Sequence, residues 1–210
     1  MRTAVILANG EPPPREALAR AVGAAALFVC ADGGANAARA FGLAPQAIVG
    51  DLDSALPETL AHFAAVPVVR EPDTERTDLE KTLEYVLARG PFAEIAVFGA
   101  TAGRLDHVLG HLSLLKRYLG RAPLVLEDAH GRAWLARGEV ELDAPPGTTV
   151  SFFAVGAPAE GVTTEGLRYP LRGARLELGA QDSVSNVVER RPARIRVERG
   201  EILVLVVTAP

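Results

Sequence analysis

Six short apolar runs recur through the first 128 residues, and their spacing constrains the fold more than any other feature of the chain. They are TAVILAN, ALFVCAD, QAIVGD, VPVVRE, EIAVFGA and PLVLED, at residues 3–9, 26–32, 46–51, 66–71, 94–100 and 123–128. Each is rich in Val, Ile and Ala and is bounded by Gly, Pro or Asp, which is typical of strands buried on both faces. Helical patterns separate the runs, most clearly at 77–89 and 105–119. This order predicts a parallel sheet with helices on both faces.

Beyond about residue 130 the pattern changes to short strand-like runs with turn residues between them and no helical period. The runs are VELDA, TTVSFFAV, GVTTEGL, ARLELG, VSNVVE, ARIRVE and EILVLVV. Such a series is typical of a small antiparallel sandwich or barrel. We therefore predict an α/β fold class: a Rossmann-like, parallel-sheet catalytic domain over residues 1–128, followed by an all-β sandwich domain over residues 129–210.

Charge and cysteine content narrow the classes of function. The formal net charge is −4 and no basic block occurs, which argues against a dedicated nucleic-acid or anionic-membrane binder. Cys30 is the single cysteine, so neither an internal disulfide nor a cysteine zinc cluster is possible. The first apolar run is too short for a signal sequence or a membrane span, so we expect a cytoplasmic protein.

Aspartates follow the ends of several predicted strands. They are Asp32 in CADGGAN, Asp51 and Asp53 in VGDLDS, Asp73 and Asp78 in PDTERTD, and Asp106 in GRLDH. In an open parallel sheet, ligands bind beyond the carboxyl ends of the strands, so these side chains can converge. Two carboxylates about 5 Å apart repel by roughly 3 kcal/mol at an effective dielectric near 20. A cluster of them favours Mg²⁺, which takes oxygen ligands and shares its shell with substrate phosphates.

Each acidic motif also has a structural interpretation. Asp32 is a possible cap for a helix starting near Gly33, and a lone D-x-D is common in turns. Thr77 and Glu80 fit a capping box. The joint occurrence of these motifs favours a metal and nucleotide site over capping alone.

Lysine is rare in this arginine-rich chain, and Lys81 lies three residues after Asp78 on the same predicted helix face. That position suits a point charge for a phosphate, although a solvated lysine remains the alternative. Gly33 and Gly34 would let the backbone approach a ligand closely. Neither G-x-G-x-x-G nor a Walker A loop occurs, which disfavours a dinucleotide dehydrogenase and a P-loop kinase.

Two histidines, His107 and His111, stand four residues apart on a predicted helix. Such a pair can bind zinc, but the intervening Val-Leu-Gly lacks the glutamate of the metalloprotease pattern. We therefore disfavour a zinc site here.

Six motifs in order resemble the signature of the thiamine pyrophosphokinase family. They are DGGAN (32–36), GDLDS (50–54), DTERTDLEK (73–81), GRLDH (103–107), TTEGLRYPL (163–171) and SVSN (183–186). The resemblance implies a Mg²⁺-dependent enzyme in which the thiamine hydroxyl attacks the β-phosphorus of ATP, giving AMP and thiamine diphosphate. It also implies a homodimer with active sites at the subunit interface.

The same resemblance implies roles for individual residues. The expected metal ligands are Asp32, Asp51, Asp53 and Asp78, and the expected catalytic group is Asp51, Asp53, Asp78 and Lys81. The expected ATP-binding residues are Asn9, Gly33, Gly34, Asn36, Thr77, Arg104 and Asp106. The expected thiamine-binding residues are Tyr169, Ser185 and Asn186. Tyr169 stands where eukaryotic members carry a stacking tryptophan, and a tyrosine offers a smaller face to a cationic ring.

Two other functions remain open from the sequence. A related pyrophosphokinase acting on another hydroxymethyl heterocycle, such as a pterin, would share the metal site. A non-catalytic nucleotide-binding protein would leave the number of acidic residues unexplained.

Overall fold

The computed structural model describes residues 2–208. The chain forms two compact units that divide between Ala129 and His130. Each unit has its own apolar core, and no helix within residues 2–208 is both long enough and apolar enough to cross a membrane.

The first unit is built on six parallel strands, in the order β6-β5-β1-β2-β3-β4. The strands are β1 (Thr3–Leu7), β2 (Leu27–Ala31), β3 (Ala47–Gly50), β4 (Val68–Arg70), β5 (Glu94–Phe98) and β6 (Leu124–Glu127). All six lie within the predicted runs and are slightly shorter. β1, β2, β3 and β5 are almost wholly buried, which explains their continuous apolar sequence.

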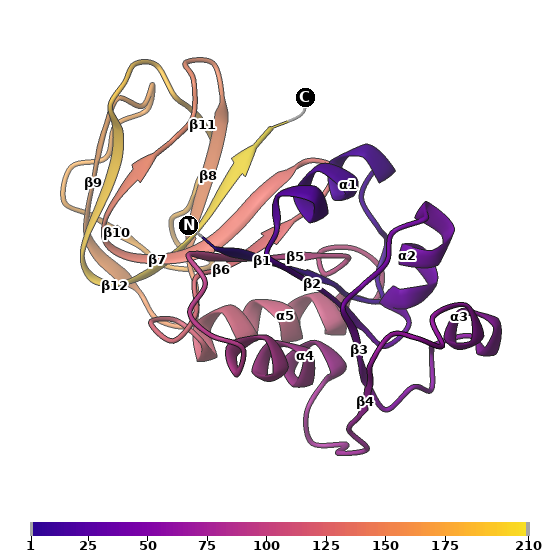
Figure 1. The fold of residues 1–210 in the computed structure, drawn as a ribbon. Helices are drawn as coiled ribbons and strands as arrows, with labels where there is room; N and C mark the ends of the chain where they lie inside the picture. The colour runs from indigo at the N-terminus through magenta and orange to yellow at the C-terminus, as the bar shows by residue number, and fades with distance from the viewer. Residues whose placement is uncertain (1, 209–210) are drawn as a thin grey trace. The chain divides into compact units, whose positions relative to one another are not determined.

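Five helices connect these strands. They are α1 (Arg15–Ala24), α2 (Gly34–Phe41), α3 (Pro57–His62), α4 (Asp78–Leu87) and α5 (Leu105–Arg117). Figure 1 shows α1 and α2 on one face of the sheet and α4 and α5 on the other. α2 stops at Gly42, whose φ of 68° is left-handed and ends the helix. One core joins residues of the sheet, such as Phe28 and Phe98, to Leu18 and Ala38 of the helices.

The second unit is antiparallel and contains β7 (Gly131–Leu142), β8 (Thr149–Ala154), β9 (Ala159–Glu165), β10 (Ala174–Leu176), β11 (Ser183–Val187) and β12 (Ala193–Val207). The prediction of separate strands ARIRVE and EILVLVV is wrong, because both belong to β12. A register shift between Val197 and Ile202 accommodates the turn residues that separate them. On either side of the shift, β12 pairs with β9 and then with β8.

Candidate active site at the carboxyl ends of the parallel strands

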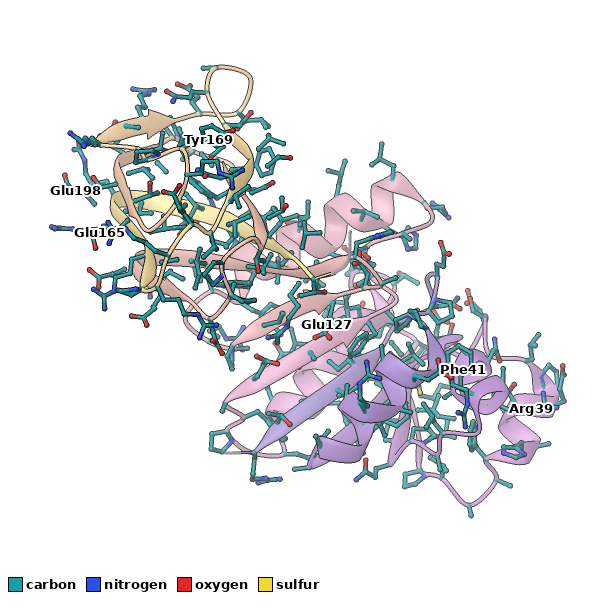
Figure 2. The ribbon with its side chains drawn as sticks, turned by 90° about the horizontal axis from the view of Figure 1, so that it is seen from above. Arg39, Phe41, Glu127, Glu165, Tyr169 and Glu198 are labelled. Atoms are coloured by element: carbon teal, nitrogen blue, oxygen red, sulfur yellow. The ribbon has the colours of Figure 1, made fainter. Side chains whose placement is uncertain are left out.

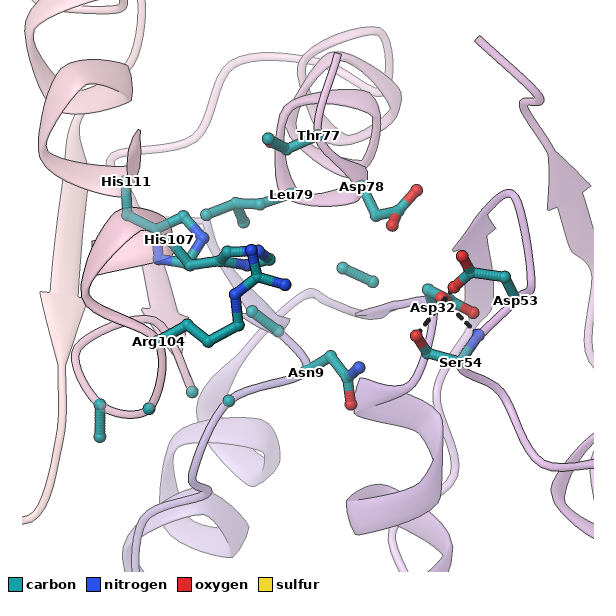
Figure 3. Close-up of a pocket in the computed structure, with 16 residues that line it drawn as sticks. Asn9, Asp32, Asp53, Ser54, Thr77, Asp78, Leu79, Arg104, His107 and His111 are labelled. Atoms are coloured by element: carbon teal, nitrogen blue, oxygen red, sulfur yellow. Dashed lines mark hydrogen bonds between the residues drawn. The ribbon is translucent and has the colours of Figure 1, made fainter. Parts of the chain in front are cut away.

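A pocket with a volume of about 460 Å³ lies in the first unit and is lined by residues that follow β1, β2, β3 and β5. Asn9 follows β1, Asp32 follows β2, and Asp53 and Ser54 follow β3. The start of α4 supplies Thr77, Asp78 and Leu79, and the segment after β5 supplies Gly99, Arg104, His107 and His111 (Figure 3). The pocket therefore lies where parallel-sheet topology predicts a ligand site.

Three aspartates meet beside one end of this pocket, and two of them, Asp32 and Asp78, line it. Ligand oxygens of Asp32, Asp51 and Asp78 all lie within 4.8 Å of one another. Asp32 is 1% exposed, and burial, reinforced by the nearby Asp78 charge, raises its pKa. Because such close carboxylates repel, the arrangement favours a cation. The predicted convergence of aspartates is therefore observed for these three residues.

Lys81 offsets part of the negative charge of the cluster. Its ammonium nitrogen lies 2.9 Å from Asp78 Oδ1 and 3.8 Å from Asp51 Oδ2, and its side chain is 1% exposed. The alternative of a solvated lysine is therefore wrong. The three carboxylates exceed the single ammonium by two negative charges, which one divalent cation neutralises. Lys81 is not among the described residues that line the pocket, and its ammonium group contacts the carboxylates of the cluster.

Gly50 keeps open the space between the carboxylates. A Cβ at this position would lie 2.8 Å from Asp32 Cβ and 3.1 Å from Asp78 Oδ1. The φ of Gly50 is 156°, within the range that side chains rarely adopt. An all-oxygen donor set around a space that a side chain would fill suits Mg²⁺. The residues present therefore fit the ion that the sequence predicts.

Asp32 holds the loop after β3 instead of capping α2. Its carboxylate accepts hydrogen bonds from the Ser54 amide at 3.0 Å and from the Ala55 amide at 3.1 Å. The cap position of α2 is Gly33, without a side-chain cap. The capping interpretation of Asp32 is therefore wrong, and the residue ties two strand ends together.

Asp53 lies outside the group of three. It lines the pocket, its amide donates to Asp51 Oδ1 at 3.1 Å, and its carboxylate accepts from Ser54 Oγ at 2.8 Å. The intervening Leu52 has a φ of 70°, so the chain turns sharply between the two aspartates. The turn sends the two side chains to different places, so Asp53 stands beside the carboxylate cluster.

The predicted capping box at α4 is half formed. Thr77 Oγ1 accepts from the Glu80 amide at 3.3 Å, but the Glu80 carboxylate binds Arg117 at 2.6 Å. Thr77 caps the helix and also lines the pocket beside Asp78. The capping interpretation of Thr77 is therefore confirmed, and its contact with ATP stays a prediction.

The glycines and the second asparagine of the chain, all in DGGAN, are accounted for by packing. A Cβ on Gly33 would lie 2.3 Å from Asn9 Oδ1, and one on Gly34 would lie 2.1 Å from the Leu7 carbonyl. The Asn36 amide donates to the Ser54 carbonyl and accepts from the Leu56 amide, both at 3.0 Å. Asn9 was also expected to bind ATP, and it lines the described pocket, whereas Gly33, Gly34 and Asn36 are not among the described residues that line it.

Arg104 and Asp106 form an exposed pair at the start of α5. Arg104 Nη2 lies 2.6 Å from Asp106 Oδ2, and this bond lowers the pKa of Asp106 to about 2. Arg104 lines the pocket, whereas Asp106 is not among the described residues that line it. Asp106 therefore orients Arg104 and does not face the cavity itself.

The sequence did not assign Ser54, His107 or His111 to this site, although all three line the pocket. The four-residue spacing of the histidines was visible in the sequence. Among the described residues, the group that could hold a metal consists of aspartates alone.

The residues predicted to bind thiamine cluster in the second unit. Asn186 is 1% exposed, and its amide accepts from the Tyr169 amide at 3.0 Å and donates to the Tyr169 carbonyl at 2.8 Å. The Tyr169 side chain is 61% exposed (Figure 2). Ser185 has a φ of 55° and donates its amide to Ser151 Oγ at 3.0 Å. Asn186 thus fixes the backbone that presents an exposed aromatic ring.

Comparison with known proteins assigns the chain to a family. Residues 18–125 match the thiamin pyrophosphokinase catalytic domain, and residues 139–202 match the thiamin pyrophosphokinase vitamin B1 binding domain. Thiamine pyrophosphokinase 1 of Oryza sativa subsp. japonica is 30% identical over 200 residues, covering 81% of this chain and 75% of its own.

Solved structures have the same fold at low identity. Thiamine pyrophosphokinase from Bacillus subtilis has a TM-score of 0.87 at 23% identity, with full coverage of both chains. Thiamin pyrophosphokinase from Candida albicans has a TM-score of 0.86 at 18% identity, covering 98% of this chain and 88% of that one. The resemblance read from the six motifs is confirmed: this chain belongs to the thiamine pyrophosphokinase family.

Proposed function

We propose that the protein transfers the diphosphate group of ATP to the hydroxyl of thiamine, giving thiamine diphosphate and AMP, with Mg²⁺. The observation that carries this proposal is the carboxylate cluster of Asp32, Asp51 and Asp78 at the end of a pocket of nucleotide size. The names of the relatives support thiamine as the acceptor, and the match to a vitamin B1 binding domain favours it over a pterin alcohol.

Transfer of a diphosphate requires positioning and charge neutralisation more than covalent catalysis. When bound, Mg²⁺ would neutralise the polyphosphate and orient its β-phosphorus. Asp32, Asp51 and Asp78 would hold the ion, Lys81 would keep Asp51 and Asp78 in place, and Arg104 would contact phosphate oxygens from the opposite wall. The thiamine oxygen would form a bond to the β-phosphorus as the bond from that phosphorus to the α–β bridging oxygen breaks. That oxygen would leave as part of AMP, and a carboxylate of the cluster would accept the hydroxyl proton.

Thiamine would be recognised by the second unit, which we propose to be a β-sandwich. Tyr169 would stack on the cationic ring system, while Ser185 and Asn186 would meet the pyrimidine. Because Tyr169 is exposed in the single chain, we further propose a homodimer in which each active site combines residues of both subunits. We also propose that the protein is cytoplasmic.

Substitution of the cluster tests the proposal. Asp51→Asn and Asp78→Asn should each lower kcat by at least about 100-fold, since each removes charge stabilisation at the reacting phosphates. Asp143→Asn, at a fully exposed carboxylate of the second unit, is the control. Products are identified by mass after incubation with ATP, Mg²⁺ and thiamine. ADP in place of AMP, or turnover that ignores thiamine, would overturn the proposed reaction.

A further inference from the structure

The pocket has two chemically different ends. The aspartates occupy one end, and Arg104, His107 and His111 occupy the other, as Figure 3 shows. If the triphosphate of the proposed substrate lies at the carboxylates, its base reaches toward the histidines. His111 belongs to α5, is 9% exposed and has no role in the mechanism above.

One hydrogen bond fixes the protonation pattern of this imidazole. Nδ1 of His111 lies 2.7 Å from the Ala100 carbonyl oxygen, and a carbonyl only accepts, so Nδ1 is the donor. Burial lowers the pKa of His111, so the ring is neutral near pH 7. A neutral imidazole that donates through Nδ1 presents Nε2 as a hydrogen-bond acceptor.

The surroundings of the ring hold this orientation. Part of His111 lines a small apolar cavity with Leu79, Leu83 and Leu115, while His107 lies with its ring centroid 6.2 Å away at 87°. Turning the ring over would break the bond to Ala100 and leave a buried carbonyl without it, which costs about 1–3 kcal/mol. The ring of His111, a residue that lines the pocket, is therefore held in one orientation.

We propose that Nε2 of His111 accepts a hydrogen bond from the exocyclic amino group of the nucleotide base and so selects 6-aminopurine over 6-oxopurine triphosphates. This inference rests on the proposed function, because it takes ATP as the occupant of the pocket. An oxo group would place a second acceptor against Nε2 and leave both unsatisfied. His111 is thus a specificity-determining residue.

A series of nucleotides tests the inference on the unaltered protein. We expect kcat/KM for purine riboside triphosphate, which lacks the amino group, to be about tenfold below that for ATP, the value of one hydrogen bond. Inosine triphosphate should be poorer still. Equal efficiency with all three, within about twofold, would overturn the inference, whether or not any variant folds.

Variants of His111 then test whether this residue causes the preference for ATP. His111→Phe should lower kcat/KM for ATP about tenfold and leave that for purine riboside triphosphate nearly unchanged, so that their ratio approaches one. His111→Gln, which retains an acceptor, should restore part of the ratio. His107→Phe is the matched control and should keep the ratio of kcat/KM values that the unaltered protein shows. A purely structural role of His111 would lower both efficiencies together and is the contrary result.

Calorimetric binding of the same three nucleotides with Mg²⁺ separates this inference from the proposed reaction. A preference for ATP in binding, without thiamine-dependent turnover, would support the role of His111 and overturn the proposed reaction. Binding without preference would overturn the role of His111 alone. Absence of binding by all three would overturn both.

Discussion

At the scale of single residues, close backbone approach explains several positions that a sequence search would assign to ligand binding. Gly34 begins α2 directly against β1, where a Cβ would lie 2.1 Å from the Leu7 carbonyl oxygen. Gly23 lies in α1 and is exposed, and a Cβ at this position would have nothing within 4 Å of it. Two helical glycines in the same unit therefore have opposite physical roles.

Replacing each glycine by alanine should change stability in opposite directions. Gly34→Ala should reduce the free energy of unfolding by about 3 kcal/mol, because β1 and α2 would have to separate. Gly23→Ala should increase it by about 0.5–1 kcal/mol through helix propensity. Urea denaturation followed by circular dichroism measures both. A neutral Gly34→Ala would show that the helix shifts freely, against the packing described.

At the scale of elements, α4 and α5 both contribute residues to the pocket, and a buried hydrogen bond connects them. The hydroxyl of Tyr118, just after α5, donates to Glu84 of α4 at 2.5 Å. Glu80, 7% exposed, accepts from Arg117 at 2.6 Å. Burial and the nearby Glu84 carboxylate raise the pKa of Tyr118, so its hydroxyl stays a donor at neutral pH. These two bonds therefore link α4 to the C-terminal end of α5.

Removing the Tyr118 hydroxyl tests whether this hydrogen bond stabilises the fold. Tyr118→Phe keeps the ring but removes the nearer of two donors to Glu84 and leaves Arg121 Nη2 at 3.4 Å, so we expect a loss of about 1 kcal/mol in the free energy of unfolding. Tyr85→Phe in α4 is the control: the Tyr85 ring packs under Arg89, and the change should stay below about 0.5 kcal/mol. Equal losses in the two variants would contradict a specific role for Tyr118.

At the scale of the whole molecule, the proposed thiamine residues lie in a different unit from the carboxylate cluster. Tyr169 is 61% exposed, and Val184, next to Ser185 in sequence, is 63% exposed. Exposed apolar side chains around a proposed binding segment are consistent with coverage by a second copy of the chain. The proposed homodimer can therefore be tested by complementation in solution.

Two inactive variants should complement each other if active sites are shared. Asp78→Asn alters the first unit and Tyr169→Ala the second, so a mixed dimer contains one intact site. An equimolar, re-equilibrated mixture should recover about a quarter of the unaltered activity, since about half the dimers are mixed and each has one working site of two. Light scattering gives the mass of the particle. A monomer, or a mixture as inactive as its components, would contradict shared sites.

Much of the local structure was predictable from the sequence. Apolar runs bounded by Gly, Pro and Asp located all six parallel strands, since a strand covered on both faces must be continuously apolar. The aspartates beyond those runs indicated where a metal could bind, because parallel strands end at the same edge of a sheet. The order of the motifs likewise identified the family.

Tertiary structure alone decided which polar groups reach the pocket. Lys81 is buried against the carboxylates and Asn36 holds a loop, so neither lines the described pocket. Asp53 does line it, although the backbone turn at Leu52 sets its side chain apart from that of Asp51. A sequence specifies which groups are present and their spacing, but contacts that form only in the folded chain set the direction of each side chain. His111 is the clearest case, because only the bond to the Ala100 carbonyl determines which nitrogen accepts.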